Sequence, residues 1–351
     1  MSTPKTKMMN YNIENLDILT NKDDRSFLEA QLELLLGKIS YIPLKYRTGD
    51  SIDIKIANIN SDLKITLSAN LTTGAVVHSQ TGESLRSLVP EVFDKFSEKL
   101  NNEVEKIRKK YSVSKKNSFV GAISIKEDEL MNLDESGRTE LFKSLITSTL
   151  PDMIGYIKRR VYSARMADIK VFNNVFVKDI VSEVILQVYG RFQADIVSVR
   201  DFNIWNIQEA DKVLNEILEN KDQFRGEISF EQLVDHELGE LEEEYTMDAD
   251  GDYVMNEEMD DYENENNYNE ELLSIIAGDK DQIEEIETPD EEFNDKIFDE
   301  LIKLPIKYQS IYDLYYFEHL EMEEIAKIKG LEPIEIEAIL ISIKELISEK
   351  F

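Results

Sequence analysis

The stretch IDIKIANINSDLKITLSANL, residues 52–71, determines the fold of the N-terminal part of the chain. Its apolar residues alternate with polar ones up to Ile56, and the alternation resumes from Leu63 to Leu71. A period of two is typical of strands that bury one face. The turn-like residues 58–62 between the two runs, four of which are polar, indicate a tight turn, and a third short strand is expected at residues 75–78, after Gly74.

Helices and one further strand are predicted on both sides of this stretch. A strand is expected around Met8–Asn15, and a helix opens at the polar cluster Asn21–Asp24. A long helix follows the strands, and Pro90 indicates that it starts near Ser87, because proline is tolerated only in the first helical turn. The element order predicted for residues 1–117 is therefore β-α-β-β-β-α.

The remaining apolar residues follow helical spacing. Residues 138–220 contain few glycines and predict successive helices, of which Val177–Tyr189 is the clearest. The polar face of that helix carries Lys178, Asp179, Glu183 and Gln187. Residues 298–351 predict a second helical unit, whose last helix spans about Ile334–Ser348.

Negative charge is concentrated in one segment. The 351 residues have a formal net charge of −32, and residues 231–300 contain 29 acidic and only 2 basic residues. Because such a run cannot bury enough apolar surface to offset the entropy of ordering, we expect a disordered linker. The predicted fold class is multidomain α+β, with an α/β domain at 1–117, an all-α bundle at 118–230, an acidic disordered linker at 231–297 and a helix-turn-helix domain at 298–351.

Several functional classes are disfavoured. There is no cysteine, no run approaching 18 apolar residues and no apolar N-terminal core of a secretory signal. The three histidines are far apart in the sequence, and the acidic run at 248–259 has Tyr253 and Met259 at the sixth and twelfth positions, where a calcium loop needs glycine and glutamate. We therefore expect a cytoplasmic protein that is not an enzyme and binds no metal, cofactor or membrane.

Basic residues gather at the end of the long helix, in the sequence KIRKKYSVSKK. One interpretation is a solvated helix tip whose lysines complement the helix dipole. The other is a patch that contacts nucleic-acid phosphates. The candidate RNA-binding residues are Lys22, Arg25, Lys38, Lys45, Arg47, Lys106, Arg108, Lys109, Lys110, Lys115 and Lys116.

The N-terminal element order and the segment VVHSQTGESLRSLVPEVFDKFSEKLNNEVEKIRKK, residues 76–110, resemble the ribosome hibernation-promoting factor family. The resemblance covers about residues 8–112. It implies a domain that lies in the decoding cleft of the small ribosomal subunit, contacts ribosomal RNA through its two helices and blocks messenger and transfer RNA.

Two other segments resemble bacterial RNA polymerase sigma factors. The run VKDIVSEVILQVYGRFQ, residues 177–193, and its flanking helices are similar to the domain that binds the polymerase core. That similarity implies a polymerase-binding or protein-binding surface at Lys178, Asp179, Glu183 and Gln187. Residues 298–351 are similar to the C-terminal helix-turn-helix domain of the same family.

The surface of that predicted helix-turn-helix argues against DNA. Its second helix offers Glu335, Glu337 and Lys344. Negative side chains repel phosphates, so promoter DNA is not an expected partner and a protein contact is favoured.

These features favour a ribosome-associated regulator of translation with sigma-like protein-interaction modules. Its expected partners are the small ribosomal subunit with its RNA and, through the helical modules, the RNA polymerase core. The alternative is a divergent sigma factor that acts in transcription at promoters. A third hypothesis is that the acidic linker mimics nucleic acid and folds back onto the basic patch.

Overall fold

The computed structural model describes residues 10–60, 62–122, 135–194, 202–219, 245–247, 253–255 and 297–348. The chain is of the mixed α+β class, as predicted. It divides into two compact units, which are described separately. Unit 1 comprises Met1–Ser124, Arg159–Asp168 and Pro289–Phe351, and unit 2 comprises Ile125–Lys158 and Ile169–Thr288.

Unit 1 contains a four-stranded sheet in the order β1-β2-β3-β4. The strands are β1 (Asn10–Glu14), β2 (Arg47–Ile59), β3 (Asp62–Leu71) and β4 (Gly74–Gly82). Strand β1 pairs with β2 in parallel, and the other neighbours are antiparallel. The register sets Ile54 opposite Leu67, so the alternation seen in the sequence gives both strands a common buried face.

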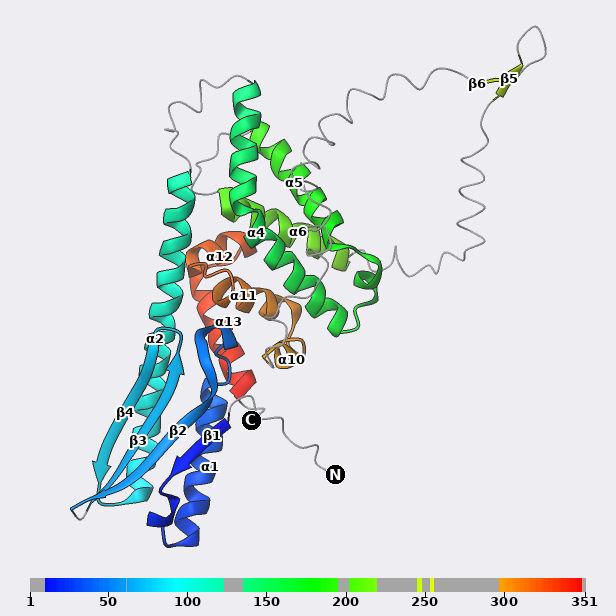
Figure 1. The fold of residues 1–351 in the computed structure, drawn as a ribbon. Coiled ribbons are helices and arrows are strands. Elements are labelled where there is room, and N and C mark those ends of the chain that lie inside the picture. The colour runs from blue at the N-terminus through cyan, green and yellow to red at the C-terminus, as the bar shows by residue number, and fades with distance from the viewer. Residues whose placement is uncertain are drawn as a thin grey trace. The chain divides into compact units, whose positions relative to one another are not determined.

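Two helices cover that face of the sheet (Figure 1). Helix α1 (Lys22–Ile39) is capped by the Asn21 side chain, which accepts from the Asp23 amide at 3.0 Å. Short 3-10 turns at Leu16–Ile18 and Leu44–Tyr46 flank α1. Helix α2 (Leu85–Ala122) packs on α1, β3 and β4 and runs well past the edge of the sheet (Figure 1). The predicted order β-α-β-β-β-α is observed.

The start of α2 differs from the expected one. The helix begins at Leu85, two residues before Ser87, so Pro90 lies in its second turn. Proline has no N–H, and the carbonyl of Arg86 therefore receives no intrahelical bond from residue 90. The contacts of Leu88, Val89 and Val92, which are all buried, offset this loss.

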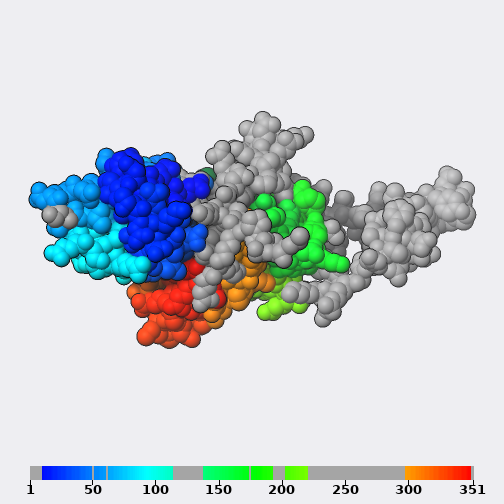
Figure 2. Space-filling model, turned by 90° about the horizontal axis from the view of Figure 1, so that it is seen from below, coloured from blue at the N-terminus to red at the C-terminus, as the bar shows by residue number. Residues whose placement is uncertain are grey.

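The C-terminal helices belong to the same unit. They are α10 (Ile297–Leu301), α11 (Ile306–Tyr316), α12 (Met322–Lys329) and α13 (Pro333–Ser348). Helix α13 packs on α11, α12 and α1, and Figure 2 shows these helices lying against the N-terminal elements. The sequence predicts separate domains at 1–117 and 298–351, whereas the structure places both in one compact unit.

Local sequence explains how α12 begins and ends. The Glu321 and Glu324 side chains form a capping box, each accepting a backbone N–H of the other residue. Gly330 ends the helix with φ 62°, in the left-handed region that glycine adopts without the usual steric penalty. The chain can therefore turn directly into α13.

Unit 2 is helical in its described core. It contains the first turns of α4 (Glu135–Met166), a 3-10 turn at Lys170–Asn174, α5 (Val177–Ala194) and α6 (Phe202–Glu219). The rings of Phe142, Phe192 and Phe202 meet at its centre, with centroids 5.4–5.9 Å apart. The Tyr156 hydroxyl donates to Asp211 Oδ1 at 2.7 Å.

The predicted acidic linker lies outside the described residues, except for the paired strands β5 (Tyr245–Met247) and β6 (Tyr253–Met255). A search of the described residues found no helix with the length and apolar character needed to cross a membrane.

Candidate functional site: a buried arginine and the basic residues of α2

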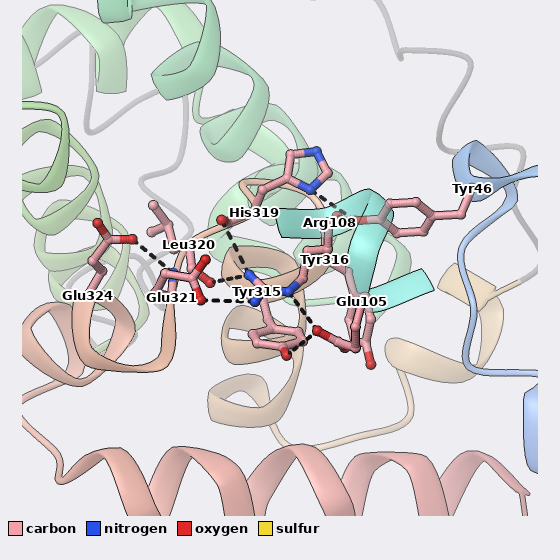
Figure 3. A network of polar contacts seen from close by, with 9 residues as sticks. All are labelled: Tyr46, Glu105, Arg108, Tyr315, Tyr316, His319, Leu320, Glu321 and Glu324. Atoms are coloured by element: carbon pink, nitrogen blue, oxygen red, sulfur yellow. Dashed lines mark hydrogen bonds and ion pairs between the residues drawn. The ribbon is translucent and has the colours of Figure 1, made fainter. Parts of the chain in front are cut away.

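Arg108 of α2 is buried in a polar network within unit 1, with 2% of its side chain exposed (Figure 3). Its guanidinium donates from Nε to Glu105 Oε2 at 3.1 Å, from Nη1 to the Leu320 carbonyl at 3.0 Å and from Nη2 to Glu321 Oε2 at 3.0 Å. A longer Nη1 contact, 3.4 Å, reaches the His319 carbonyl. Most of these acceptors lie in residues 315–321, which comprise the last two residues of α11 and the connection to α12 and are called the 315–321 segment below.

Tyr315 completes the surroundings of this arginine. The ring centroid of Tyr315 lies 4.2 Å from Arg108 Cζ, and its hydroxyl donates to Glu105 Oε2 at 2.9 Å. Burial opposes the positive charge of Arg108, but Tyr315, Glu321 and Glu105 together raise the pKa of the guanidinium above its usual value. Arg108 is therefore a permanently charged group that is neutralised by protein contacts.

His319 occupies the centre of the 315–321 segment with a left-handed backbone, φ 57°. The buried Tyr46 hydroxyl donates to the Tyr316 carbonyl at 2.5 Å and lies 2.9 Å from His319 Nδ1. Because the hydroxyl has a single proton, Nδ1 of His319 must be the donor in the second contact. The His319 ring also stacks on Tyr111 of α2, with centroids 5.1 Å apart.

Two lysines are engaged beside this network. Lys45 Nζ donates to the Phe317 carbonyl at 3.0 Å and lies 4.4 Å from the centre of the Phe317 ring. Lys344 Nζ of α13 lies 4.6 Å from the centre of the Tyr41 ring, and burial lowers the pKa of Lys344. The Tyr312 hydroxyl donates to the Tyr41 carbonyl at 2.6 Å. Both lysines thus contact aromatic rings inside unit 1.

A second arginine binds the other end of the same connection. Arg159, in the part of α4 that belongs to unit 1, donates from Nε to both carboxylate oxygens of Asp313, at 2.9 and 3.1 Å. Its Nη2 donates to Glu318. Arg159, Asp313 and Glu318 are 5%, 5% and 4% exposed. Burial raises the pKa of Asp313 to about 6, with a smaller contribution from the neighbouring Glu318 carboxylate and against the opposing effect of Arg159.

The sequence predicts the basic RNA-binding residues of α2 at the end of the long helix, but α2 continues to Ala122, so they lie in its second half. They differ in exposure. Lys106, Lys109 and Lys110 are exposed, and Lys106 pairs with Glu103 at 2.7 Å. Arg108, between them, faces inward. The side chains of residues 115 and 116, both lysines, lie outside the part of the chain that the structure describes.

The other predicted RNA-binding residues do not form one patch with them. Lys22 is exposed in the first turn of α1, and Arg25 donates from Nε to the Leu19 carbonyl at 2.6 Å. Lys38, in the last turn of α1, pairs with Asp94 of α2 at 2.7 Å. At 1.5 Å per residue, Lys22 and Lys38 are about 24 Å apart along α1. Arg47 is buried, with 8% exposed.

The residues predicted for protein binding lie on α5 and are solvent-accessible in unit 2. Lys178, Asp179 and Glu183 are exposed. Gln187 is half-buried, donates to Glu183 at 2.7 Å and accepts from Lys212 Nζ at 3.4 Å. The amphipathic spacing of this helix is therefore matched by its burial.

The predicted helix-turn-helix surface on α13 presents acidic and apolar groups. Glu335 and Glu337 are exposed, whereas Lys344 is turned toward Tyr41. Ile334 and Ile341 are 73% and 50% exposed. Lys344 is the only basic residue in the described part of α13, and it faces Tyr41 instead of solvent.

Sequence reasoning missed the polar network itself. The described residues contain no group of histidine, aspartate and glutamate side chains that could hold a metal ion. Comparisons with family models, curated proteins and solved structures found no match.

Proposed function

We propose that this protein is a ribosome-associated regulator of translation that binds the small ribosomal subunit through the α/β part of unit 1. The observation that carries the proposal is the group of exposed lysines in the second half of α2, Lys106, Lys109 and Lys110, on a helix that extends beyond the sheet. The order of the N-terminal elements agrees with the resemblance to hibernation factors that the sequence suggests.

The physical basis is recognition of folded RNA by its backbone. Structured RNA presents phosphates and 2′-hydroxyls across a shallow groove, so a protein contacts it largely through shape and charge. Lysines that neutralise phosphates release counterions, and binding then weakens steeply as salt increases. Three exposed lysines on the second half of a helix that extends beyond the sheet are suited to that contact.

The test measures binding of the full chain to purified small ribosomal subunits at about 50 and 200 mM salt. The variant K109E/K110E should lose most of the binding and show a shallower salt dependence. The matched control is K303E/K307E, which changes the net charge by the same amount at two exposed positions, one in the turn after α10 and one in α11. Equal binding by K109E/K110E and the unmodified chain would refute the proposal.

A second candidate function is protein recognition through unit 2, with the RNA polymerase core as the proposed partner. The exposed Lys178, Asp179 and Glu183 on α5 favour it, because packing of the helix uses only its apolar face. A pull-down of polymerase core by the full chain should succeed and should be weakened by D179K/E183K. If the variant retains the polymerase fully, α5 is not the contact.

A role at promoters receives less support. The outward residues Glu335 and Glu337 of α13 would approach phosphates with the wrong sign, and Lys344 is directed toward Tyr41. If the chain is a divergent sigma factor, it should start transcription in a promoter-directed assay with polymerase core. Because α13 does not suit DNA, we expect no initiation in that assay.

A further inference from the structure

Two of the cations that we expect to meet RNA are bound by the C-terminal part of the same chain. Arg108 contacts the Leu320 carbonyl and the Glu321 carboxylate, and Lys45 contacts the Phe317 carbonyl. We infer that the 315–321 segment is an intramolecular latch that competes with RNA for Arg108. This inference rests on the proposed RNA-binding function and adds a mode of regulation to it.

The acceptors of the latch resemble those that a nucleic-acid backbone would offer. Around Arg108 they comprise the carboxylate of Glu321 and the main-chain carbonyls of residues 319 and 320. The planar guanidinium that donates to them can also form paired hydrogen bonds with a phosphate. A phosphate cannot occupy these positions while the segment is present, because the arginine is only 2% exposed. Binding of RNA to Arg108 and closure of the latch therefore exclude each other.

The latch lies next to the exposed lysines. Arg108 is one residue from Lys109 on α2, and Tyr111, one turn further on, stacks on His319 of the segment. RNA that follows the exposed lysines would consequently reach the edge of the latch. In the open state Arg108 would add a cation with bidentate geometry to a surface that otherwise offers only lysines.

The structure also indicates where the latch can open. His319 has a left-handed backbone that is unfavourable for any residue with a side chain, so its conformation depends on the surrounding contacts. Its neighbour Glu318 is bound by buried Arg159, which anchors the segment on one side. Opening is therefore expected at residues 319–321, with Glu318 and Asp313 remaining bound to Arg159.

The test compares two variants of the full chain. E321Q removes the charge that faces Arg108 but leaves an oxygen that can still cap α12. E323Q removes one negative charge from the same first turn, at an exposed position. If the latch limits binding, E321Q should tighten binding to small ribosomal subunits about fivefold, because apparent affinity scales with the population of the open state. E323Q should leave the affinity within about 1.5-fold of the unmodified chain, because it affects only a screened surface charge.

A disulfide gives a second test in one protein. The chain has no native cysteine, so Y111C/H319C introduces a single pair across the latch, where the two rings stack. The oxidised form should bind the subunits more weakly than the reduced form of the same sample. Circular dichroism of both forms checks that the fold is retained.

The outcomes separate the latch from the proposed function. The latch is supported if E321Q tightens binding, E323Q does not, and oxidation of Y111C/H319C weakens binding. Salt-sensitive binding that is the same in all of these proteins overturns the latch and leaves the RNA-binding function standing. Absence of salt-sensitive binding in every protein, including E321Q, overturns both.

Discussion

Removal of Arg159 should destabilise unit 1 strongly at neutral pH. The variant R159M keeps a side chain of similar length but removes the cation that Asp313 and Glu318 share. The two acidic residues are at most 5% exposed, so their carboxylates would remain buried without that cation. Breaking a buried pair by removing one partner typically costs 3–5 kcal/mol, so we expect a loss of about 4 kcal/mol at pH 7. The triple variant R159M/D313N/E318Q, in which no charge remains, should recover much of this loss.

The pH dependence of the loss provides an internal check. Burial raises the pKa of Asp313 to about 6, so between about pH 4 and 6 the folded state binds more protons than the unfolded state. The contribution of Asp313 to stability therefore decreases as pH rises through this window and is least favourable above pH 6. Because Asp313 is mostly neutral at pH 5, R159M should lose less there than at pH 7, by about 1–2 kcal/mol.

Urea unfolding with two optical signals can measure this effect. Near-UV circular dichroism reports the tyrosines clustered in unit 1, among them Tyr312, Tyr315 and Tyr316. The single tryptophan, Trp205, lies on α6 of unit 2 beside Arg191, and its fluorescence should show an unchanged midpoint. The reasoning fails if R159M is as stable as the unmodified chain at pH 7, or if its loss is the same at pH 5 and is not recovered in the triple variant.

Three substitutions elsewhere in unit 1 should have smaller or more local effects on urea unfolding. Asn21→Ala removes the N-terminal cap of α1 and should cost about 1 kcal/mol, whereas Asn21→Ser should cost little. Gly330→Ala should cost about 1 kcal/mol through its positive φ alone, since a Cβ there meets no atom within 4 Å, and Gly330→Asn should cost less. Leu67→Ala should cost about 2–5 kcal/mol at its fully buried position on β3, and exposed Val77→Ala on β4 is the control, with a loss of at most about 0.5 kcal/mol.

The local elements could be predicted because they depend on short-range patterns. The alternation at residues 52–71 predicts β2 and β3, and Asn21 marks the start of α1 correctly. Helix α2 begins two residues before Ser87, because the packing of buried Leu88 and Val92 favours a start at Leu85 even though it leaves Pro90 in the second turn. Tertiary contacts decide such boundaries as much as local preference does.

The burial of Arg108 was also encoded in the sequence. It lies four residues after Val104 and eight after Leu100, on the buried stripe of α2, whereas Lys106, Lys109 and Lys110 lie off that stripe. Its position therefore indicated an inward direction despite its basic neighbours.

The acceptors of Arg108 could not be predicted from one sequence. They are more than 200 residues away in the chain, at Leu320 and Glu321. No periodicity links positions so far apart, and the acidic segment between them suggested independent modules. The run of aromatic residues Tyr312–Phe317, which is almost wholly buried, was the local sign that this region packs against a large apolar surface.

The assembly of unit 1 from three distant stretches has a consequence for synthesis of the protein. Its earliest residues complete their packing only after α13 has left the translating ribosome, since α13 is the last described helix and packs on α1. Until residues 316–321 have emerged, Tyr46 and Arg108 lack their partners in α11 and the 315–321 segment. Nascent chains therefore pass through a period in which these side chains are solvated, and premature termination before α10 would make that state permanent.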